Sequence, residues 1–306
     1  LGRSGTGKTS YCIDAIVDAL LKPSDRPLIL LVPEQATYQA ERSILTHRGV
    51  DGYHRLHVLS FNRLQFMLLG SNTATPTLSR IGRQMLVHRI LCRESDNLHV
   101  FAGSASSPGL AGRIAGTIAE LHDYAQGPDD IDALLEQLGR DRPESLTAFK
   151  FADIRLILAE YYKAIESRFL DPDMLLTRAC AAVPHADFVK GATLWVDGFA
   201  SFSEAEMAIL AELLKTVDDA SLALCLDPSV VSSADRAAAA PDPADMFYPT
   251  RCTYESLRQR IARCRLDLDE PIVLREPIRF ADSRPLAHLE RCLYETNART
   301  ISADDG

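Results

Sequence analysis

The chain has 306 residues, of which 46% are hydrophobic and 25% charged, and its formal net charge is -9. This is the composition of a globular protein large enough for two compact units, and apolar runs such as residues 28–32 are too short to cross a membrane. The net negative charge argues against a protein whose whole surface attracts nucleic acid. DNA binding would therefore need a local groove.

A glycine-rich loop opens the chain. The string Gly2-Arg3-Ser4-Gly5-Thr6-Gly7-Lys8-Thr9 fits the phosphate-loop pattern G-x-x-x-x-G-K-[ST] at every fixed position. In such loops backbone N–H groups surround a polyphosphate, the lysine reaches the β- and γ-phosphates, and the hydroxyl binds Mg²⁺. A helix predicted over residues 10–21 would place its N-terminus on the phosphates. We therefore predict an ATP-Mg²⁺ site at residues 2–9; the alternative is a chance glycine-rich turn.

The first part of the chain alternates strands and helices. Strands are predicted over residues 27–33 and 56–60, and helices over 37–46 and 61–69, which is typical of a parallel α/β sheet. The strand that should lead into the loop is reduced to Leu1. We therefore expect the chain to begin inside this domain.

Helices dominate from about residue 78 to residue 182, with breaks at 103–109 and 127–128. One helix carries an apolar stripe that predicts a helical core. The stripe consists of Ile154, Ile157, Leu158, Tyr161 and Ile165.

Strands return at residues 193–197 and 221–227, with a helix over 204–214 between them. The simplest organisation is an α/β domain interrupted by a helical insertion. The predicted divisions are residues 1–75 and 186–306 for the two parts of the α/β domain, and 76–185 for the insertion.

The rest of the chain is less regular. Residues 228–245 are rich in Ser, Ala, Asp and Pro and are predicted to form a mobile surface loop. An amphipathic helix is predicted over 253–264, a strand near 272–274, and a helix over 287–295.

A second informative site is the strand that ends at Asp197. A phosphate-loop enzyme uses an aspartate in this place to hold Mg²⁺ through water, opposite the Thr9 hydroxyl, although Asp197-Gly198 also fits a simple turn. Active motor helicases place a water-orienting glutamate directly after the aspartate, where this chain has Gly198. Glu204 and Glu206 follow nearby, but Ser203-x-x-Glu206 fits a helix capping box better.

These motifs resemble, in order, those of the N-terminal part of the AddB family, the B subunits of bacterial AddAB helicase-nucleases, to which RexB is closely related. The resemblance rests on the glycine-rich loop and on four further strings. They are Leu31-Val32-Pro33-Glu34-Gln35-Ala36-Thr37-Tyr38, Ser60-Phe61-Asn62-Arg63-Leu64, Val196-Asp197-Gly198-Phe199 with Ser201-Phe202, and more weakly His288-Leu289-Glu290-Arg291-Cys292-Leu293.

The resemblance implies a superfamily 1 helicase-like P-loop NTPase fold whose motor has decayed, which agrees with Gly198. It also implies a cytoplasmic subunit that acts in double-strand break repair beside an AddA-type helicase-nuclease partner. The family's nuclease and iron-sulfur cluster would lie beyond residue 306, so we assign no catalytic residue and no metal cluster here.

The resemblance further implies a protein that grips single-stranded DNA and scans it for the recombination hotspot Chi. Single strands are held by aromatic platforms and a few polar groups. By motif position the candidates are Gln35, Thr37, Phe61, Arg63, Phe66, Phe199 and Phe202. Phe61 and Phe66 could equally belong to the core, and Thr37 could cap a helix. Arg63 is the strongest candidate, because packing hardly explains an arginine at a helix start.

Two other functions stay open. One is an active superfamily 1 DNA helicase, and a more distant one is a P-loop small-molecule kinase, for which we would expect an arginine-rich lid and a chain complete in itself. Loss of the water-orienting glutamate favours the decayed motor over the active helicase.

Other patterns indicate no metal site. Asp171-Pro172-Asp173 is typical of a helix start. His54 and His57, with Arg55, are predicted to form a surface basic cluster. Seven cysteines lie singly without C-x-x-C, which favours reduced thiols in a cytoplasmic protein.

Overall fold

The computed structural model describes residues 1–47, 49–70, 76–124, 126–141, 145–166, 168–232 and 240–293. They form two compact units. The α/β unit contains Leu1–Leu64, Val183–Phe202 and the chain from Leu210 onward, and the helical unit contains Gln65–Ala182 and Ser203–Ile209. The predicted boundaries after residues 75 and 185 stay predictions.

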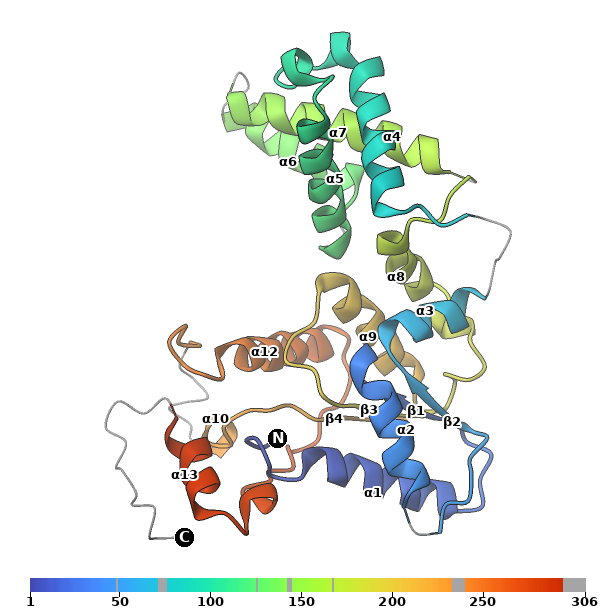
Figure 1. Ribbon diagram of the computed structural model, residues 1–306, viewed down its shortest axis with the longest axis vertical. Coiled ribbons are helices and arrows are strands. Elements are labelled where there is room, and N and C mark those ends of the chain that lie inside the picture. The colour runs from blue at the N-terminus through green and yellow to red at the C-terminus, as the bar shows by residue number, and fades with distance from the viewer. Residues whose placement is uncertain are drawn as a thin grey trace. The chain divides into compact units, whose positions relative to one another are not determined.

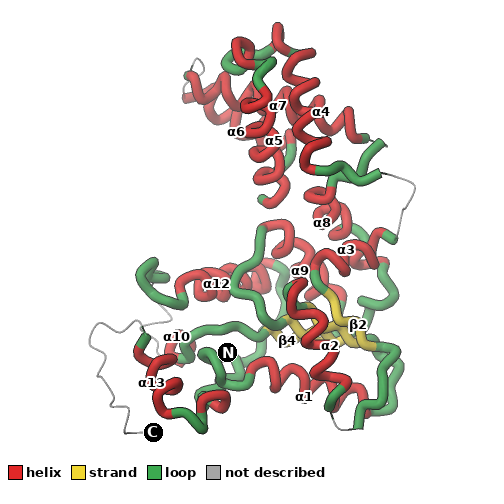
Figure 2. Tube along the Cα trace, in the orientation of Figure 1, coloured by secondary structure: helices red, strands yellow, loops and turns green. Residues whose placement is uncertain are grey.

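The centre of the α/β unit is a parallel sheet of four strands in the order β2-β1-β3-β4. Strands are yellow in Figure 2. The strands are β1 (Leu28–Leu31), β2 (Leu56–Leu59), β3 (Thr193–Val196) and β4 (Asp219–Leu222). Every residue of β1 and β3 is buried. Continuous apolar strands such as these are expected where helices cover both faces of a parallel sheet.

Helices α1 and α2 pack against one face of this sheet (Figure 1). Ile16 of α1 and Ile44 of α2 are fully buried, and they share a core with Leu28, Leu30 and Trp195 from the strands. The helices with residues in the α/β unit are α1 (Lys8–Leu21), α2 (Thr37–Leu45), α3 (Phe61–Leu69), α9 (Glu204–Thr216), α10 (Ser229–Ser232), α12 (Tyr248–Arg263) and α13 (Arg284–Cys292), with short turns η1 (Glu34–Ala36), η4 (Val183–His185) and η5 (Ile278–Phe280).

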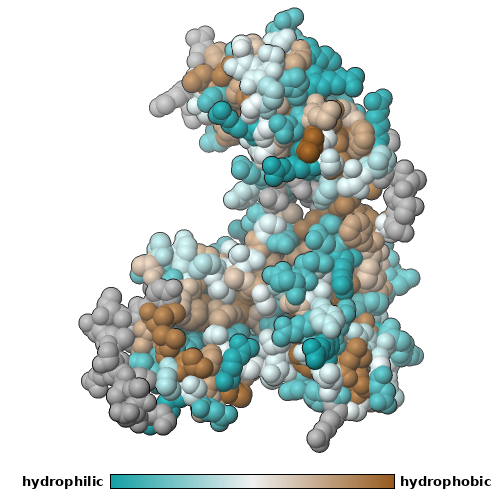
Figure 3. Space-filling view, in the orientation of Figure 1, coloured by the Kyte–Doolittle hydropathy of each residue, from teal (hydrophilic) through white to brown (hydrophobic). Residues whose placement is uncertain are grey.

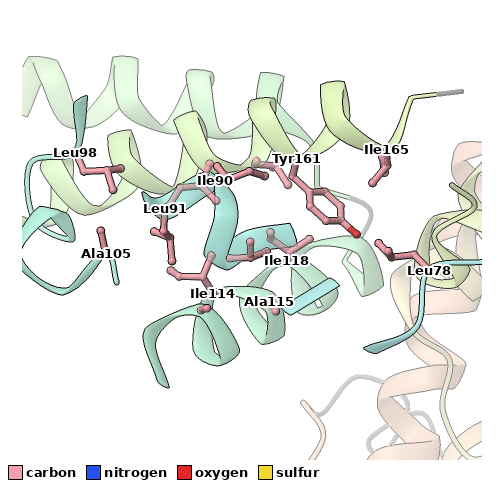
Figure 4. Close-up of a cluster of buried hydrophobic side chains, with 14 of the residues drawn as sticks. Leu78, Ile90, Leu91, Leu98, Ala105, Ile114, Ala115, Ile118, Tyr161 and Ile165 are labelled. Carbon is pink, nitrogen blue, oxygen red and sulfur yellow. The ribbon is translucent and has the colours of Figure 1, made fainter. Parts of the chain in front are cut away.

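The helical unit packs around one apolar core, shown in Figure 4. Its helices are α4 (Arg80–Arg93), α5 (Pro108–Asp123), α6 (Pro128–Asp141), α7 (Leu146–Ile165) and α8 (Pro172–Cys180), with turns η2 (Ser95–Asn97) and η3 (Ala102–Ser104). Ile157, Leu158 and Tyr161 are fully buried and Ile165 nearly so, while Ile154 packs at the edge. The predicted apolar stripe is therefore confirmed as core.

A buried carboxylate fixes the connection between α4 and α5. Asp153 of α7 is 1% exposed, and its oxygens accept hydrogen bonds from the backbone N–H groups of His99 (2.8 Å), Val100 (2.8 Å) and Phe101 (3.0 Å). Three backbone donors satisfy a charge that would otherwise be costly to bury.

Some predicted elements differ from the observed ones. The strand predicted over 221–227 is observed as β4 at Asp219–Leu222, and residues 224–226 instead flank Gly2 through a bridge at Cys225. The strand predicted near 272–274 is only a bridge between Gly2 and Leu274. The helix predicted to start at residue 253 starts at Tyr248.

The last two predicted segments also differ in part. The loop predicted over 228–245 includes helix α10, whose Val230 is 5% exposed and packs with Leu226 and Phe247; residues 233–239 lie outside the described part. Helix α13 carries exposed leucines along one side, Leu286 and Leu289, in a region where Figure 3 shows apolar surface. The helix predicted over 287–295 is observed as α13, which begins at Arg284.

Candidate functional site

The glycine-rich loop leads directly into α1. The helix begins at Lys8 and its N-cap, Gly7, has a left-handed backbone with φ 85°. No side chain caps the helix N-terminus, and its first turn contains no acidic residue. Uncapped N–H groups at the start of a helix are suited to bind an anion.

Gly5 shows why the loop needs glycine. Its φ is 75°, which favours glycine, and a Cβ placed there would lie 2.6 Å from Cε2 of Phe280. The backbone N–H of Arg279 also donates to the Gly5 carbonyl at 3.0 Å. Turn η5 therefore packs against the loop, a contact that sequence patterns alone did not indicate.

Lys8 and Thr9, at the start of α1, both make hydrogen bonds at the candidate site. The Lys8 ammonium donates to the carbonyls of Gly2 (2.8 Å) and Arg3 (2.6 Å) across the loop. The Thr9 hydroxyl donates to Oδ2 of Asp197 at 2.6 Å. Asp197 follows the last residue of β3 and is 7% exposed. The structure thus brings together the two side chains that were predicted to hold Mg²⁺.

Arg3 connects the loop to distant parts of the α/β unit. Its guanidinium donates to Glu290 Oε1 (2.9 Å), to the Glu290 carbonyl (2.8 Å) and to Asp227 Oδ2 (3.1 Å), and it lies over the Phe247 ring. Burial acts to raise the pKa of Asp227, but hydrogen bonds from Ser229 and the charge of Arg3 outweigh burial and leave this pKa lowered. The side chain of Arg3 therefore has a role in holding the fold.

A buried cysteine lies beneath the loop on α1. Burial, helped by the charge of Asp197, raises the pKa of Cys12 to about 12. Because the thiolate is the reactive form, Cys12 is an inert thiol at neutral pH.

Glu206 is engaged in hydrogen bonds and is not free to act as a general base. Its Oε2 accepts from the backbone N–H of Ser203 at 2.8 Å, and its own N–H donates to the Ser203 hydroxyl at 3.2 Å. This reciprocal pair confirms the predicted capping box.

Three of the DNA-binding candidates form one aromatic cluster. Phe61 lies 5.4 Å from Phe199 and 6.1 Å from Phe202, ring centre to ring centre, and the latter two rings are 5.0 Å apart. Phe61 is 7% exposed, whereas Phe199 and Phe202 are half-buried. Phe61 is therefore the buried member of the cluster, and only the rings of Phe199 and Phe202 are partly exposed to solvent.

The polar candidates differ from one another. Gln35 is exposed, but Thr37 is 3% exposed and its hydroxyl donates to the Glu34 carbonyl at 3.0 Å. The N-cap position before α2 is Ala36, so Thr37 is not the predicted cap. The Thr37 hydroxyl is therefore buried and held inside its own turn.

Arg63 has a partner that its sequence neighbours did not reveal. It is exposed, and its Nη1 donates to Glu41 Oε1 of α2 at 3.0 Å. Ser60, the residue before α3, donates a hydrogen bond from its hydroxyl to the side chain of Glu34. Phe66, by contrast, is 60% exposed, so it does not belong to the core.

The predicted surface basic cluster is wrong for Arg55 and His57. Arg55 is 9% exposed and donates to the carbonyls of Ala19 (2.5 Å) and Lys22 (3.1 Å), where it satisfies the C-terminal end of α1. His57 packs edge-on against Phe188, and burial lowers its pKa. These two residues stabilise the fold.

Asp171 begins a helix as predicted, since α8 starts at Pro172, but its carboxylate has a further role. It pairs with Arg83 at 2.5 Å and accepts a hydrogen bond from the Tyr161 hydroxyl, all within the buried core. Among the described residues no group of three His, Cys, Asp or Glu side chains is placed to hold a metal. No described helix is long and apolar enough to span a membrane.

Residues 1–290 match the protein family described as "ADDB, N-terminal". A protein of Symbiobacterium thermophilum, named as the B subunit of an ATP-dependent helicase/deoxyribonuclease, is 37% identical over 97% of this chain and 26% of its own length. Proteins of the same name from Moorella thermoacetica and Desulforudis audaxviator are each 36% identical over 95% of this chain and 25% of theirs. This chain thus spans about a quarter of the length of these relatives. Because the family match extends along nearly the whole chain, the protein belongs to the AddB N-terminal family.

Proposed function

We propose that this chain is the helicase-like N-terminal region of the B subunit of an ATP-dependent helicase/deoxyribonuclease. In this proposal it binds ATP-Mg²⁺ and single-stranded DNA in the cytoplasm, has little motor activity of its own, and works beside an AddA-type partner. The complex would process double-strand breaks for recombinational repair and scan one strand for Chi.

One observation carries the nucleotide part of the proposal. Thr9, at the start of α1, lies 2.6 Å from Asp197 at the end of β3. Hydroxyl and carboxylate oxygens are the ligands that Mg²⁺ prefers, and the carboxyl ends of parallel strands are where α/β sheets bind ligands. Thr9 and Asp197 would hold the ion, whose charge would offset that of the phosphates. The uncapped N–H groups of α1 and the Lys8 ammonium fit the phosphates themselves.

Weak hydrolysis is inferred from Gly198, which stands where an active motor has its water-orienting glutamate. Of the two glutamates that follow nearby, Glu204 and Glu206, Glu206 is engaged in a capping box. Loss of a positioning group typically costs several kcal/mol of transition-state stabilisation. The chain therefore keeps the parts that bind nucleotide and lacks the part that activates water.

The DNA part of the proposal rests on side chains that follow the strands of the sheet. Gln35 is exposed after β1, and Arg63 is exposed after β2. Phe199 and Phe202 offer partly exposed rings after β3. Aromatic platforms beside amide and guanidinium groups are the usual means of holding single strands.

A matched pair of variants tests the proposal in the full-length protein with its partner. Gln35→Ala and Arg63→Ala should impair Chi-dependent protection of DNA fragments while unwinding continues. If both activities survive each substitution, the proposed groove is wrong. If unwinding fails first, these residues belong to an active motor and the rival helicase function is correct.

A further inference from the structure

Helix α12 concentrates positive charge in an acidic protein. Residues 248–265 contain five arginines and only one acidic residue, Glu255, while the chain as a whole has a net charge of -9. An acidic protein as a whole does not attract a polyanion. A basic helix on its surface therefore points to a local binding site for a polyanionic partner.

The arginines divide into a structural member and an exposed group. Arg251 is 5% exposed and its Nε lies 3.3 Å from Glu255, so it belongs to the fold. Arg258, Arg263 and Arg265 are exposed, and the described part of the chain contains no carboxylate paired with any of them. We call these three residues the α12 arginines.

Helix stability alone does not explain the α12 arginines. Basic residues in the last turn complement the helix dipole, an effect that fades beyond that turn. Arg263 fits this explanation, but Arg258 lies before the last turn and Arg265 lies beyond the end of α12. The Arg258 guanidinium is held over the Tyr254 ring, 5.7 Å from its centre.

Arg265 has an unusual backbone. Its φ is 56°, and it is the one non-glycine residue of the described chain with a positive φ. The position just after a helix is normally glycine in this conformation, because a side chain there costs stability. A guanidinium is thus kept at a place where glycine would fold more easily, and such strain is concentrated at functional sites.

The helix is anchored to the loop that carries the aromatic cluster. Thr253, which is 6% exposed, donates its hydroxyl to the Ala200 carbonyl at 2.9 Å. Ala200 lies between Phe199 and Phe202, the two rings that present a surface. One hydrogen bond therefore connects the basic helix to the proposed base platforms.

We propose that the α12 arginines bind the phosphate backbone of single-stranded DNA whose bases contact Phe199 and Phe202. This inference rests on the single-strand binding proposed above and adds the surface that holds the backbone. Exposed guanidinium groups bind phosphate well, and the adjoining aromatic loop favours a single strand over a duplex.

The test compares full-length variants for binding to a labelled oligothymidylate and to a blunt hairpin duplex over a range of salt. Arg265→Gly should weaken single-strand binding while the unfolding midpoint stays equal to that of the wild type or rises, since glycine relieves the backbone. Arg265→Lys should retain most of the affinity. The triple variant R258Q/R263Q/R265G should flatten the slope of log affinity against log salt by about two units, at ~0.7 per phosphate contact.

Arg140→Gln is the matched control, because it removes one exposed arginine from the last turn of α6 in the helical unit. It should leave the affinity and the salt slope unchanged. The inference is overturned if the triple variant binds like the wild type, if R140Q causes an equal loss, or if the loss is confined to the duplex. Failure of the wild type itself to bind oligothymidylate would instead reject the proposed function.

Discussion

The Thr9 hydroxyl donates a 2.6 Å hydrogen bond to Asp197, a residue 188 positions later in the chain. This contact joins the start of α1 to the end of β3 beside the glycine-rich loop. Gly198, the next residue, has φ 85°, and a Cβ there would lie 3.2 Å from Cδ of Pro33. Thus a glutamate cannot enter this position without strain.

Gly198→Glu is therefore expected to lower stability and not to restore a motor. A side chain in the left-handed region costs roughly 1–2 kcal/mol, and the contact with Pro33 adds to this. The measurements are the unfolding free energy and DNA-stimulated ATP turnover of the variant and the wild type. Robust turnover by the wild type would contradict the decayed-motor proposal, and a gain in turnover by G198E at unchanged stability would contradict the strain expected at this position.

Phe66 and Phe61 should respond differently to replacement by alanine. Phe66 is 60% exposed, so F66A should leave the fold stable and, if the ring stacks on a base, reduce single-strand affinity by about 1–3 kcal/mol with little change in salt dependence. Phe61 is 7% exposed, so F61A should cost about 3–5 kcal/mol of stability. Titration with single-stranded DNA and chemical unfolding distinguish the two. Unchanged DNA affinity in F66A would show that its ring does not stack on a base.

The contact between Arg3 and Asp227 predicts a pH dependence. The pKa of Asp227 is lowered in the folded protein, so its ionised form stabilises the fold above the unfolded pKa of about 3.9. This contribution is lost as the pH falls below about 4, through the folded pKa. Asp227→Asn should remove about 1–2 kcal/mol at pH 7 and less at pH 3.

Asp132→Asn is the control for this measurement, because Asp132 pairs with Arg155 at the exposed surface and should matter little. Unfolding curves at both pH values compare the variants. An equal loss in D227N at pH 7 and pH 3 would show that its carboxylate charge is not responsible.

The buried pair of Asp171 and Arg83 should be essential to the helical unit. The Asp171 side chain is 0% exposed and that of Arg83 is 8% exposed. Asp171→Asn removes the carboxylate charge from this buried ion pair, and breaking a buried pair typically costs about 3–5 kcal/mol. Tyr161→Phe removes only one hydrogen bond to the same carboxylate and should cost about 1–3 kcal/mol. A D171N protein as stable as Y161F would show that the ion pair adds little.

Short-range patterns predicted much of the fold and part of the site. The string around Lys8 and Thr9, the buried strand before Asp197, and the stripe from Ile157 to Ile165 each depend on neighbours within a few residues. Periodicity and glycine content record such local constraints directly.

The contacts that the sequence did not reveal join residues far apart in the chain. Arg3 and Glu290 are 287 positions apart, and Arg63 finds Glu41 on another helix. Arg55 lies in a later loop, yet it donates a hydrogen bond to a carbonyl in the last turn of α1. The sequence around an arginine does not reveal whether its side chain binds DNA, a carboxylate or the end of a helix, so only the fold distinguishes these roles.

The most direct test of the central proposal is nucleotide binding by the full-length protein, measured by calorimetry with and without Mg²⁺. The wild type should bind ATP more tightly with Mg²⁺, Lys8→Ala should lose binding, and Asp197→Asn should keep weak binding but lose the Mg²⁺ dependence. R140Q serves as the control and should bind like the wild type. Binding in K8A equal to that of the wild type, or no binding by the wild type, would contradict the account.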